Sequence, residues 1–342
     1  MGKNRLARCP ASAPLNNGRL GYRSASKIAR EESAVKLAPL EVELKLDVSA
    51  EDIDKLKRHS LARRWRSSGK RELISVYLDT VDHAFCRRGL SFRLRRKGER
   101  LLQTIKGAYR GILDRTEQET PFDCDRDDRH GSIETFLQQF EDWKLPTALK
   151  PIFKTRIERE TYQIGGIEVC LDKGKVIAGR LSAPIAEIEL KLKDGDRSAL
   201  FALARQISTI VPAELSVTSK SERGYDLVGR AKRQAVMAQH AILPLFATVP
   251  ETFQFICSEC LYHLIANKSG VRALAPEALH QPRVALRRFD TALKLFRQIA
   301  SGPEAKRVAR ELKWLGDELA RARELDVFLT DVLVPAQEEP SK

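Results

Sequence analysis

The stretch "PLEVELKLDVS" at residues 39–49 constrains the fold of this chain more than any other. Within it Glu41, Glu43 and Lys45 alternate with three aliphatic residues. Successive side chains of a β-strand point to opposite faces, so the pattern predicts a strand with one charged and one aliphatic face. An ordinary strand with its charged face in water has the same pattern, so this stretch leaves the direction of the charged face open.

The same alternation recurs later in the chain. "EIELKL" at 187–192 repeats the pattern of two acids and a lysine, and "RTEQE" at 115–119 places an arginine and two acids on one face. "SFRLRRK" adds a basic pair, Arg93 and Arg95. Such faces are typical either of ion-paired outer surfaces or of a barrel lined with charges. A charged lining would suit a polyanion bound together with a divalent metal ion, because carboxylates bind hard cations and Arg binds phosphate oxygens.

Turn signals between these stretches predict short connections and therefore antiparallel neighbours. Helices are expected at 50–65, beginning after Ser49 with Asp52 three residues on, and at 196–210, beginning at Asp196. Eight antiparallel strands with few helices predict a closed barrel, because closure removes the sheet edges. The predicted strands are 40–47, 73–80, 89–97, 100–106, 112–120, 153–163, 166–172 and 185–192.

From about residue 240 the pattern changes to a helical period. "PEALHQPRVALRRFDTALKLFRQI" and "EAKRVARELKWLGDELARARELDVFLT" predict amphipathic helices of a bundle, with a boundary near "AILPLFATVP". Pro282 is expected to kink its helix or to begin it. The fold class is therefore α+β: an eight-stranded antiparallel barrel with flanking helices, followed by a helical segment.

The chain of 342 residues carries a net charge of +14, which favours anionic partners. Residues 1–36 hold eight Lys and Arg against two Asp and Glu, and their composition predicts a disordered tail. The sequence has no long apolar run, so no membrane span is expected. Six scattered cysteines without a secretory signal favour reduced thiols in the cytoplasm, and the CxxC of Cys257 and Cys260 is typical of helix packing.

The order of several motifs resembles the CYTH family, named for class IV adenylate cyclase and thiamine triphosphatase and also called triphosphate tunnel metalloenzymes. The motifs are "EVELKL", "YLDT", "RRGLSFRLRR", "QTIKG", "RTEQE", "PIFKTRIER", "IEVCLDKG", "EIELKLKDG" and "SKSERGY". The resemblance implies an eight-stranded tunnel that binds a triphosphate inside, which would direct the charged faces into the barrel.

The resemblance also implies roles for individual residues. Glu117 and Glu119 would join the acidic lining, and Lys191 stands where many members have a third Glu, so one metal ligand is expected to be missing. The implied catalytic residues are Glu41, Glu43 and Lys45. The implied ligands of Mg²⁺ or Mn²⁺ are Glu41, Glu43, Glu187 and Glu189. The implied phosphate-binding residues are Lys45, Arg93, Arg95, Lys106, Arg159 and Lys220.

"LHQPRVALRRFDTALKLF" and "LKWLGDELARARELDVF" resemble the start of a CHAD domain, a helical module that commonly follows CYTH and binds polyphosphate. Its length is about half of that usual for the module, so self-association or partial disorder is expected. The predicted organisation is a tail at 1–36, a CYTH domain at 37–235 and a partial CHAD domain at 245–335. The residues expected to bind polyphosphate share one helix face and are His280, Arg283, Arg287 and Lys294.

These features favour a metal-dependent inorganic triphosphatase that converts tripolyphosphate to pyrophosphate and phosphate. The main alternative is a protein that binds polyphosphate without cleaving it. Thiamine triphosphatase and class IV adenylate cyclase are further alternatives, although no base-recognition signature is present. Nucleic acid is disfavoured as a partner because the bases are mixed with acids and lack interleaved aromatics.

Overall fold

A computed structural model of the chain describes residues 40–97, 100–122, 148–229, 235–238, 243, 246–273 and 275–328. The predicted N-terminal tail at 1–36 lies outside these residues.

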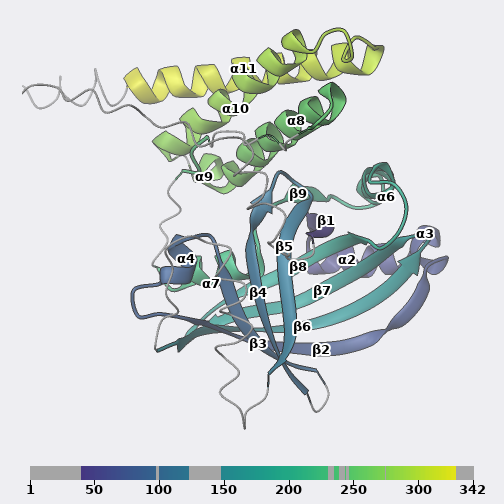
Figure 1. Ribbon diagram of the computed structural model, residues 1–342, viewed down its shortest axis with the longest axis vertical. Coiled ribbons are helices and arrows are strands. Elements are labelled where there is room, and N and C mark those ends of the chain that lie inside the picture. Colours follow the sequence, from purple (N-terminus) through teal and green to yellow (C-terminus); the bar gives the residue numbers. More distant parts are fainter. Residues whose placement is uncertain are drawn as a thin grey trace, which may run out of the picture. The chain divides into compact units, whose positions relative to one another are not determined.

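Eight antiparallel strands close into a barrel (Figure 1). Their order around it is β5, β4, β3, β2, β6, β7, β8, β1, and β1 closes the circle by pairing with β5 through Leu40–Val42. A short ninth strand, β9, pairs with the end of β1. The closed eight-stranded barrel predicted from the sequence is confirmed. The strands are β1 (Leu40–Asp47), β2 (Arg66–Asp79), β3 (Ser91–Lys97), β4 (Arg100–Arg110), β5 (Asp114–Phe122), β6 (Lys150–Ile164), β7 (Ile167–Ala178), β8 (Leu181–Leu192) and β9 (Glu214–Ser216).

Several strands are longer than their alternation predicted. The sequence placed the start of β2 at residue 73, but the strand begins at Arg66. Residues 66–72 are exposed throughout, so they show no alternation of polar and apolar residues although they pair with β6. Similarly, β7 continues to Ala178. The three residues of β9 were not predicted because they are too few to show a period.

The helices beside the barrel differ from the prediction at their ends. α2 (Ala50–Arg58) begins as predicted, with Ser49 Oγ accepting a hydrogen bond of 3.0 Å from the backbone N–H of Asp52. The expected helix at 50–65 is divided, because His59 is extended and caps α3 (Ser60–Arg63). α6 (Ser198–Ser208) begins two residues later than expected. Two shorter helices were not predicted, α4 (Ala84–Arg87) and α7 (Lys220–Leu227).

The aliphatic faces of β1 and β8 point outward from the barrel. Leu44 and Leu190 are 1% and 0% exposed, and both belong to one core with Ile53 of α2 and Ile207 of α6. Because alternate residues of a strand point to opposite faces, the charged residues between them point into the barrel. The structure therefore shows that the charged faces of β1 and β8 point into the barrel, a direction that the alternation alone left open.

The C-terminal segment contains α8 (Val249–Ala266), α9 (Lys268–Arg272), α10 (Pro276–Leu295) and α11 (Pro303–Val327). α10 packs against both α8 and α11. Pro282 lies inside α10, which begins six residues earlier, so the suggestion that this proline begins the helix was wrong. Within the described part of the chain, no helix is long and apolar enough to cross a membrane.

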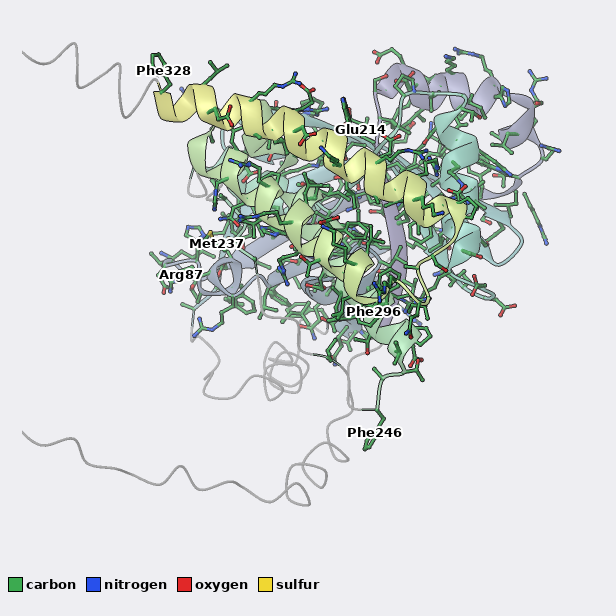
Figure 2. All side chains as sticks on the ribbon, turned by 90° about the horizontal axis from the view of Figure 1, so that it is seen from above. Arg87, Glu214, Met237, Phe246, Phe296 and Phe328 are labelled. Carbon is green, nitrogen blue, oxygen red and sulfur yellow. The ribbon has the colours of Figure 1, made fainter. Side chains whose placement is uncertain are left out.

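α8 contacts the turn between β4 and β5. Ser258 Oγ accepts a hydrogen bond of 3.1 Å from the backbone N–H of Ile112. Gly111 has a φ of +63°, and a Cβ there would lie 2.1 Å from Ser258 Oγ, so only glycine fits both the turn and the contact. Large apolar side chains remain exposed further along the segment, among them Trp314 and Leu325. Figure 2 shows Phe246 and Phe328 projecting from the ribbon in the same way.

Replacing Leu44 by Ala is expected to lower the free energy of unfolding by about 2–5 kcal/mol, because it leaves a cavity under α2 and α6. Leu181→Ala is the matched control, since Leu181 is 56% exposed on β8. Its effect should stay within about 0.5 kcal/mol. Urea unfolding of both variants measures the difference, and equal losses would contradict an outward-facing core.

Candidate active site in the charged tunnel

The barrel encloses a cavity of about 430 Å³ that receives side chains from each of its eight strands and from α7. Its lining is strongly charged and mixes acids with bases. Glu117 and Glu119 of β5 belong to it, as the sequence suggested. Of the residues predicted for metal and phosphate binding, those that line the cavity are Glu41, Glu43, Lys45, Arg93, Arg95, Lys106, Arg159, Glu189 and Lys220.

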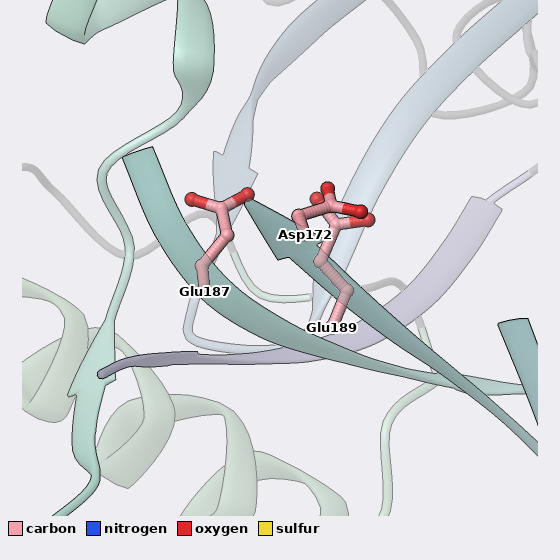
Figure 3. Close-up of side chains that lie close together, drawn as sticks. All are labelled: Asp172, Glu187 and Glu189. Carbon is pink, nitrogen blue, oxygen red and sulfur yellow. The ribbon is translucent and has the colours of Figure 1, made fainter. Parts of the chain in front are cut away.

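Three carboxylates converge inside the barrel and form what we call the acidic trio: Asp172, Glu187 and Glu189 (Figure 3). Of these, Glu189 lines the cavity itself. All three are buried, and one oxygen from each lies within 4.8 Å of the others. Asp172 was not among the predicted residues. Glu168, Cys170 and Asp172 do alternate with Val169 and Leu171 in β7, but the cysteine weakens the charge pattern. The alternation of β7 nevertheless places Asp172 on the same face as Glu168 and Cys170.

Cations from three elements, α7, β6 and β1, hold the acidic trio together. Lys220 Nζ lies 2.7 Å from Asp172 Oδ2 and 2.8 Å from Glu189 Oε1, and it also bonds Glu187 Oε1. Arg159 donates to both oxygens of Asp172 and to Glu189 Oε2, each at 2.6 Å. Lys45 Nζ is 3.8 Å from Glu187 Oε1 and 3.9 Å from Glu189 Oε1.

These contacts give the acids of the trio different pKa values. Burial disfavours the charge on Glu189, but Arg159 and Lys220 outweigh it and hold the pKa of Glu189 well below its usual range. Burial raises the pKa of Glu187 despite the neighbouring Lys220 and Lys45. Burial also disfavours the charge on Lys220, yet Asp172 and Glu187 raise the pKa of its ammonium. Lys220 therefore stays protonated among these acids.

Glu41 and Glu43 line the tunnel beside the acidic trio but are not members of it. Lys106 Nζ lies 3.1 Å from Glu41 Oε2, and Lys191 also bonds Glu41. The hydroxyl of Tyr109 donates a hydrogen bond of 2.5 Å to Glu43 Oε1. The resemblance stated above implies a third Glu at the position of Lys191. In this chain Lys191 instead places a positive charge among the acids.

Basic side chains from β3 and β4 form what we call the basic wall: Arg93, Arg95 and Lys106. These strands lie opposite β7 and β8 in the strand order of the closed barrel. Arg93 Nε is buried with no hydrogen-bond acceptor among the described residues. Burial, with the neighbouring Arg93, lowers the pKa of Arg95 to about 10. Arg93 Nε is therefore a donor that an anion inside the tunnel could accept from.

Contacts of α7 with β2 and β6 place Lys220 in the tunnel. Tyr225 OH donates a hydrogen bond of 2.7 Å to Asp79 Oδ2. Ser219 and Glu222 form a capping box at the start of the helix. A Cβ on Gly224 would lie 2.1 Å from the ring of Phe153, so glycine lets the helix approach β6 closely. The motif "SKSERGY" thus combines three residues that line the cavity, Ser219, Lys220 and Ser221, with residues that hold the helix in place.

The tunnel residues fit a divalent cation. Glu43 Oε2 and Glu187 Oε2 are buried and accept no hydrogen bond from the described residues. Buried polar atoms are normally satisfied, so oxygens left in this state mark places for a ligand. Carboxylate oxygens are the ligands that hard divalent cations prefer.

The helical ridge predicted for polyphosphate, comprising His280, Arg283, Arg287 and Lys294, lies on α10. Arg287 and Lys294 are exposed, while the other two are partly buried. Lys294 pairs with Asp290 at 2.6 Å, which reduces the positive charge at that end of the ridge. On α8, Cys257 and Cys260 are free thiols, and burial raises the pKa of Cys257 to about 12.

Comparison with known families identifies the fold and the tunnel. The profile of the CYTH domain matches residues 39–225, which is more than half of the chain. The chain belongs to the CYTH domain family. A CHAD domain follows it, matching residues 256–342. CYTH enzymes are metal-dependent, and the buried acidic trio lies in the tunnel where this requirement can be met.

The chain is 30% identical over 193 residues to a curated protein, the inorganic triphosphatase of Haemophilus influenzae. The match covers 54% of this chain and 54% of the relative, so the chain spans about half the length of that protein. HpAC1 from Hippeastrum is 16% identical, over 55% of this chain and 95% of its own, with a TM-score of 0.41. The Mimivirus capping enzyme triphosphatase is 11% identical, over 54% and 96%, with a TM-score of 0.36. These two structural likenesses are too low to support a functional inference.

Glu117→Gln is expected to lower the free energy of unfolding at neutral pH. It should also make that free energy fall less steeply than in the wild type as the pH is lowered. Burial disfavours the charge on Glu117, but Lys106 and Arg93 outweigh it and hold its pKa far below the usual range. An acid whose pKa is lower in the folded than in the unfolded protein stabilises the fold. Its contribution is complete above the pKa of the unfolded state, about 4.3, and is lost as the pH falls toward the pKa of the folded state. Urea unfolding between pH 7 and pH 3 measures it.

The control is Glu158→Gln, since Glu158 is an exposed acid of β6 paired with exposed Lys70. Its unfolding free energy should change by no more than about 0.5 kcal/mol at any of these pH values. If Glu117→Gln matched this control, Glu117 would not be held in an ion-paired tunnel.

Proposed function

We propose that this protein is a divalent-metal-dependent inorganic triphosphatase that hydrolyses tripolyphosphate to pyrophosphate and phosphate. The observation that carries the proposal is a closed tunnel with the acidic trio on one side and the basic wall on the other. A linear triphosphate needs cations along its length and a metal site at the phosphate that is cleaved. The inorganic triphosphatase of Haemophilus influenzae, similar over 193 residues, supports the same substrate class.

In this proposal the basic wall binds the phosphate oxygens. Arg93 contributes its Nε, which has no acceptor among the described residues, and Arg95 and Lys106 add charge from the same side. Arg159 and Lys220 extend the positive lining toward the acidic trio. Fixed cations in a buried tunnel stabilise the charge that spreads over the transferred phosphoryl group.

The proposed metal is Mg²⁺ or Mn²⁺, held by Glu187 and Glu189 together with Asp172, with Glu41 and Glu43 alongside. Such an ion, when bound, neutralises phosphate oxygens and makes a nearby water more acidic. Glu43 Oε2, which accepts no hydrogen bond from the residues that the structure describes, would orient the attacking water. The water oxygen bonds to the terminal phosphorus, the bridging P–O bond breaks, and pyrophosphate leaves with the electron pair and takes up the proton that the water loses. We assign Glu41 to holding this arrangement and Lys45 to stabilising the charge that develops.

A non-catalytic polyphosphate-binding protein is the second candidate. It is favoured by the observation that Arg159 and Lys220 already neutralise the acidic trio, as they would in a tunnel built only to hold an anion. Thiamine triphosphatase and adenylate cyclase activities use the same family fold. Phosphate release from tripolyphosphate distinguishes the triphosphatase from a binding protein, and its release from thiamine triphosphate would indicate a thiamine triphosphatase. Cyclic AMP formation from ATP would indicate an adenylate cyclase.

The purified protein should release phosphate from tripolyphosphate faster than from pyrophosphate, thiamine triphosphate or ATP. The preference follows from a tunnel whose lining offers cations to phosphate oxygens, while the sequence carries no base-recognition signature. Phosphate release with Mg²⁺, Mn²⁺ or a chelator measures it. Faster turnover of ATP, or release that a chelator does not reduce, would reject the proposed substrate and mechanism.

Glu43→Gln and Glu189→Gln should each lower tripolyphosphate turnover by about 100-fold or more, because each removes a charge from the reacting site while keeping the side-chain shape. Glu158→Gln, on the outer surface, is the control and should keep wild-type turnover. Steady-state kinetics and thermal unfolding together separate lost chemistry from lost folding. Wild-type turnover in both tunnel variants would exclude these roles.

We also propose that the helical ridge binds long polyphosphate. Replacing His280, Arg283 and Arg287 together by Gln should weaken that binding, while tripolyphosphate turnover stays within about twofold because separated sites act independently. Fluorescence anisotropy with labelled polyphosphate measures the binding. Unchanged binding would reject the ridge, and a collapse of turnover in a folded variant would reject the separation of the two sites.

A further inference from the structure

The acidic trio is already filled by a cation that belongs to the protein. Lys220 Nζ lies 2.7 Å from Asp172 Oδ2 and 2.8 Å from Glu189 Oε1, and it also bonds Glu187 Oε1. The ammonium donates hydrogen bonds to Glu187 and Glu189 and forms an ion pair with Asp172, so it contacts all three carboxylates. The carboxylates of Figure 3 therefore converge on the position of this nitrogen.

A divalent cation and this ammonium cannot occupy that position together. Mg²⁺ binds carboxylate oxygens at about 2.1 Å, so an ion shared by these oxygens would lie where Nζ now sits. Arg159 shares Asp172 Oδ2 with Lys220, but it bonds Glu189 through Oε2, leaves Oε1 of Glu189 to Lys220 and forms no ion pair with Glu187 in the described part of the chain. Among the described cations, Lys220 is thus the one that bonds all three acids. Glu187 Oε2, buried and without a hydrogen bond among the described residues, offers a further oxygen to an ion.

Lys220 can leave without any strand moving. It is the first residue of α7, and it reaches the trio through a flexible four-carbon chain. The helix itself stays seated through Tyr225 on Asp79 and through the capping box of Ser219. Arg159, by contrast, extends from the middle of β6 and holds Asp172 with two parallel bonds.

We infer that Lys220 is a tethered competitor of the metal: a divalent cation enters the acidic trio only by displacing the Lys220 ammonium, which then turns to the phosphate in the tunnel. This inference rests on the proposed function and adds a regulation of its metal site. The exchange keeps the buried acids neutralised at every stage, since one cation replaces another. It also makes phosphate and metal binding cooperative, because an anion in the tunnel gives the displaced ammonium a new partner.

Titration of the substrate-free protein with Mn²⁺, followed by calorimetry or electron paramagnetic resonance, tests the exchange. Lys220→Met should bind Mn²⁺ about tenfold or more tightly than the wild type, because the competing cation is gone. Lys45→Met separates exchange from simple electrostatics, since Lys45 lies 3.8 Å and 3.9 Å from the same oxygens without hydrogen-bonding them. Lys57→Met controls for net charge from α2.

The inference requires the gain in Lys220→Met to exceed the gain in Lys45→Met severalfold, with Lys57→Met unchanged. Equal gains at positions 220 and 45, or no gain at 220, would overturn it. If wild-type protein hydrolyses tripolyphosphate with Mn²⁺ while Lys220→Met gains nothing, only the exchange is rejected and the proposed function stands.

A second measurement uses the wild-type protein and does not depend on how the variant folds. Acetic anhydride labelling with mass spectrometry reports whether each lysine amine is free. Mn²⁺ should increase the labelling of Lys220 severalfold, while Lys57 on the outside stays constant. Labelling of Lys220 that Mn²⁺ leaves unchanged or reduces would overturn the exchange.

Discussion

The structure depends on the pairing of buried charges inside the barrel. A carboxylate moved from water into a protein interior loses several kcal/mol of solvation unless cations and hydrogen bonds replace the water. Glu187 and Asp172 are fully buried, and Lys220 and Arg159 supply that replacement. Removing one member would leave the others uncompensated, so the lining behaves as one network.

The outer layer makes this lining possible. The same strands that direct acids and bases inward direct leucines and isoleucines outward, where α2 and α6 cover them. The hydrophobic energy of the domain therefore comes largely from the outside of the barrel, and the inside remains open for an anion. α7 is the exception, since it is a helix that sends Lys220 into the tunnel.

Alternation in the sequence predicted the faces of β1 and β8 and the closed barrel, because period two survives wherever one face is buried. It could not give the direction of those faces, which depends on where α2 and α6 pack. Asp172 was missed because Cys170 interrupts the charged face of β7. Tyr109 was missed because its contact with Glu43 joins residues 66 positions apart. The expected helix is divided at His59 because the backbone of this one residue is extended. The spacing of apolar residues along a helix gives no sign of such a break.

The most direct test of the central claim, that the charged lumen binds a metal and a triphosphate together, is a crystal structure with Mn²⁺ and imidotriphosphate, a non-hydrolysable analogue. The account predicts an anomalous Mn²⁺ peak about 2.2 Å from oxygens of Asp172, Glu187 and Glu189, with the analogue on Arg93, Arg95 and Lys106. Lys220 should then contact the analogue. An analogue bound only on the outer surface, with Lys220 still among the three acids, would contradict it.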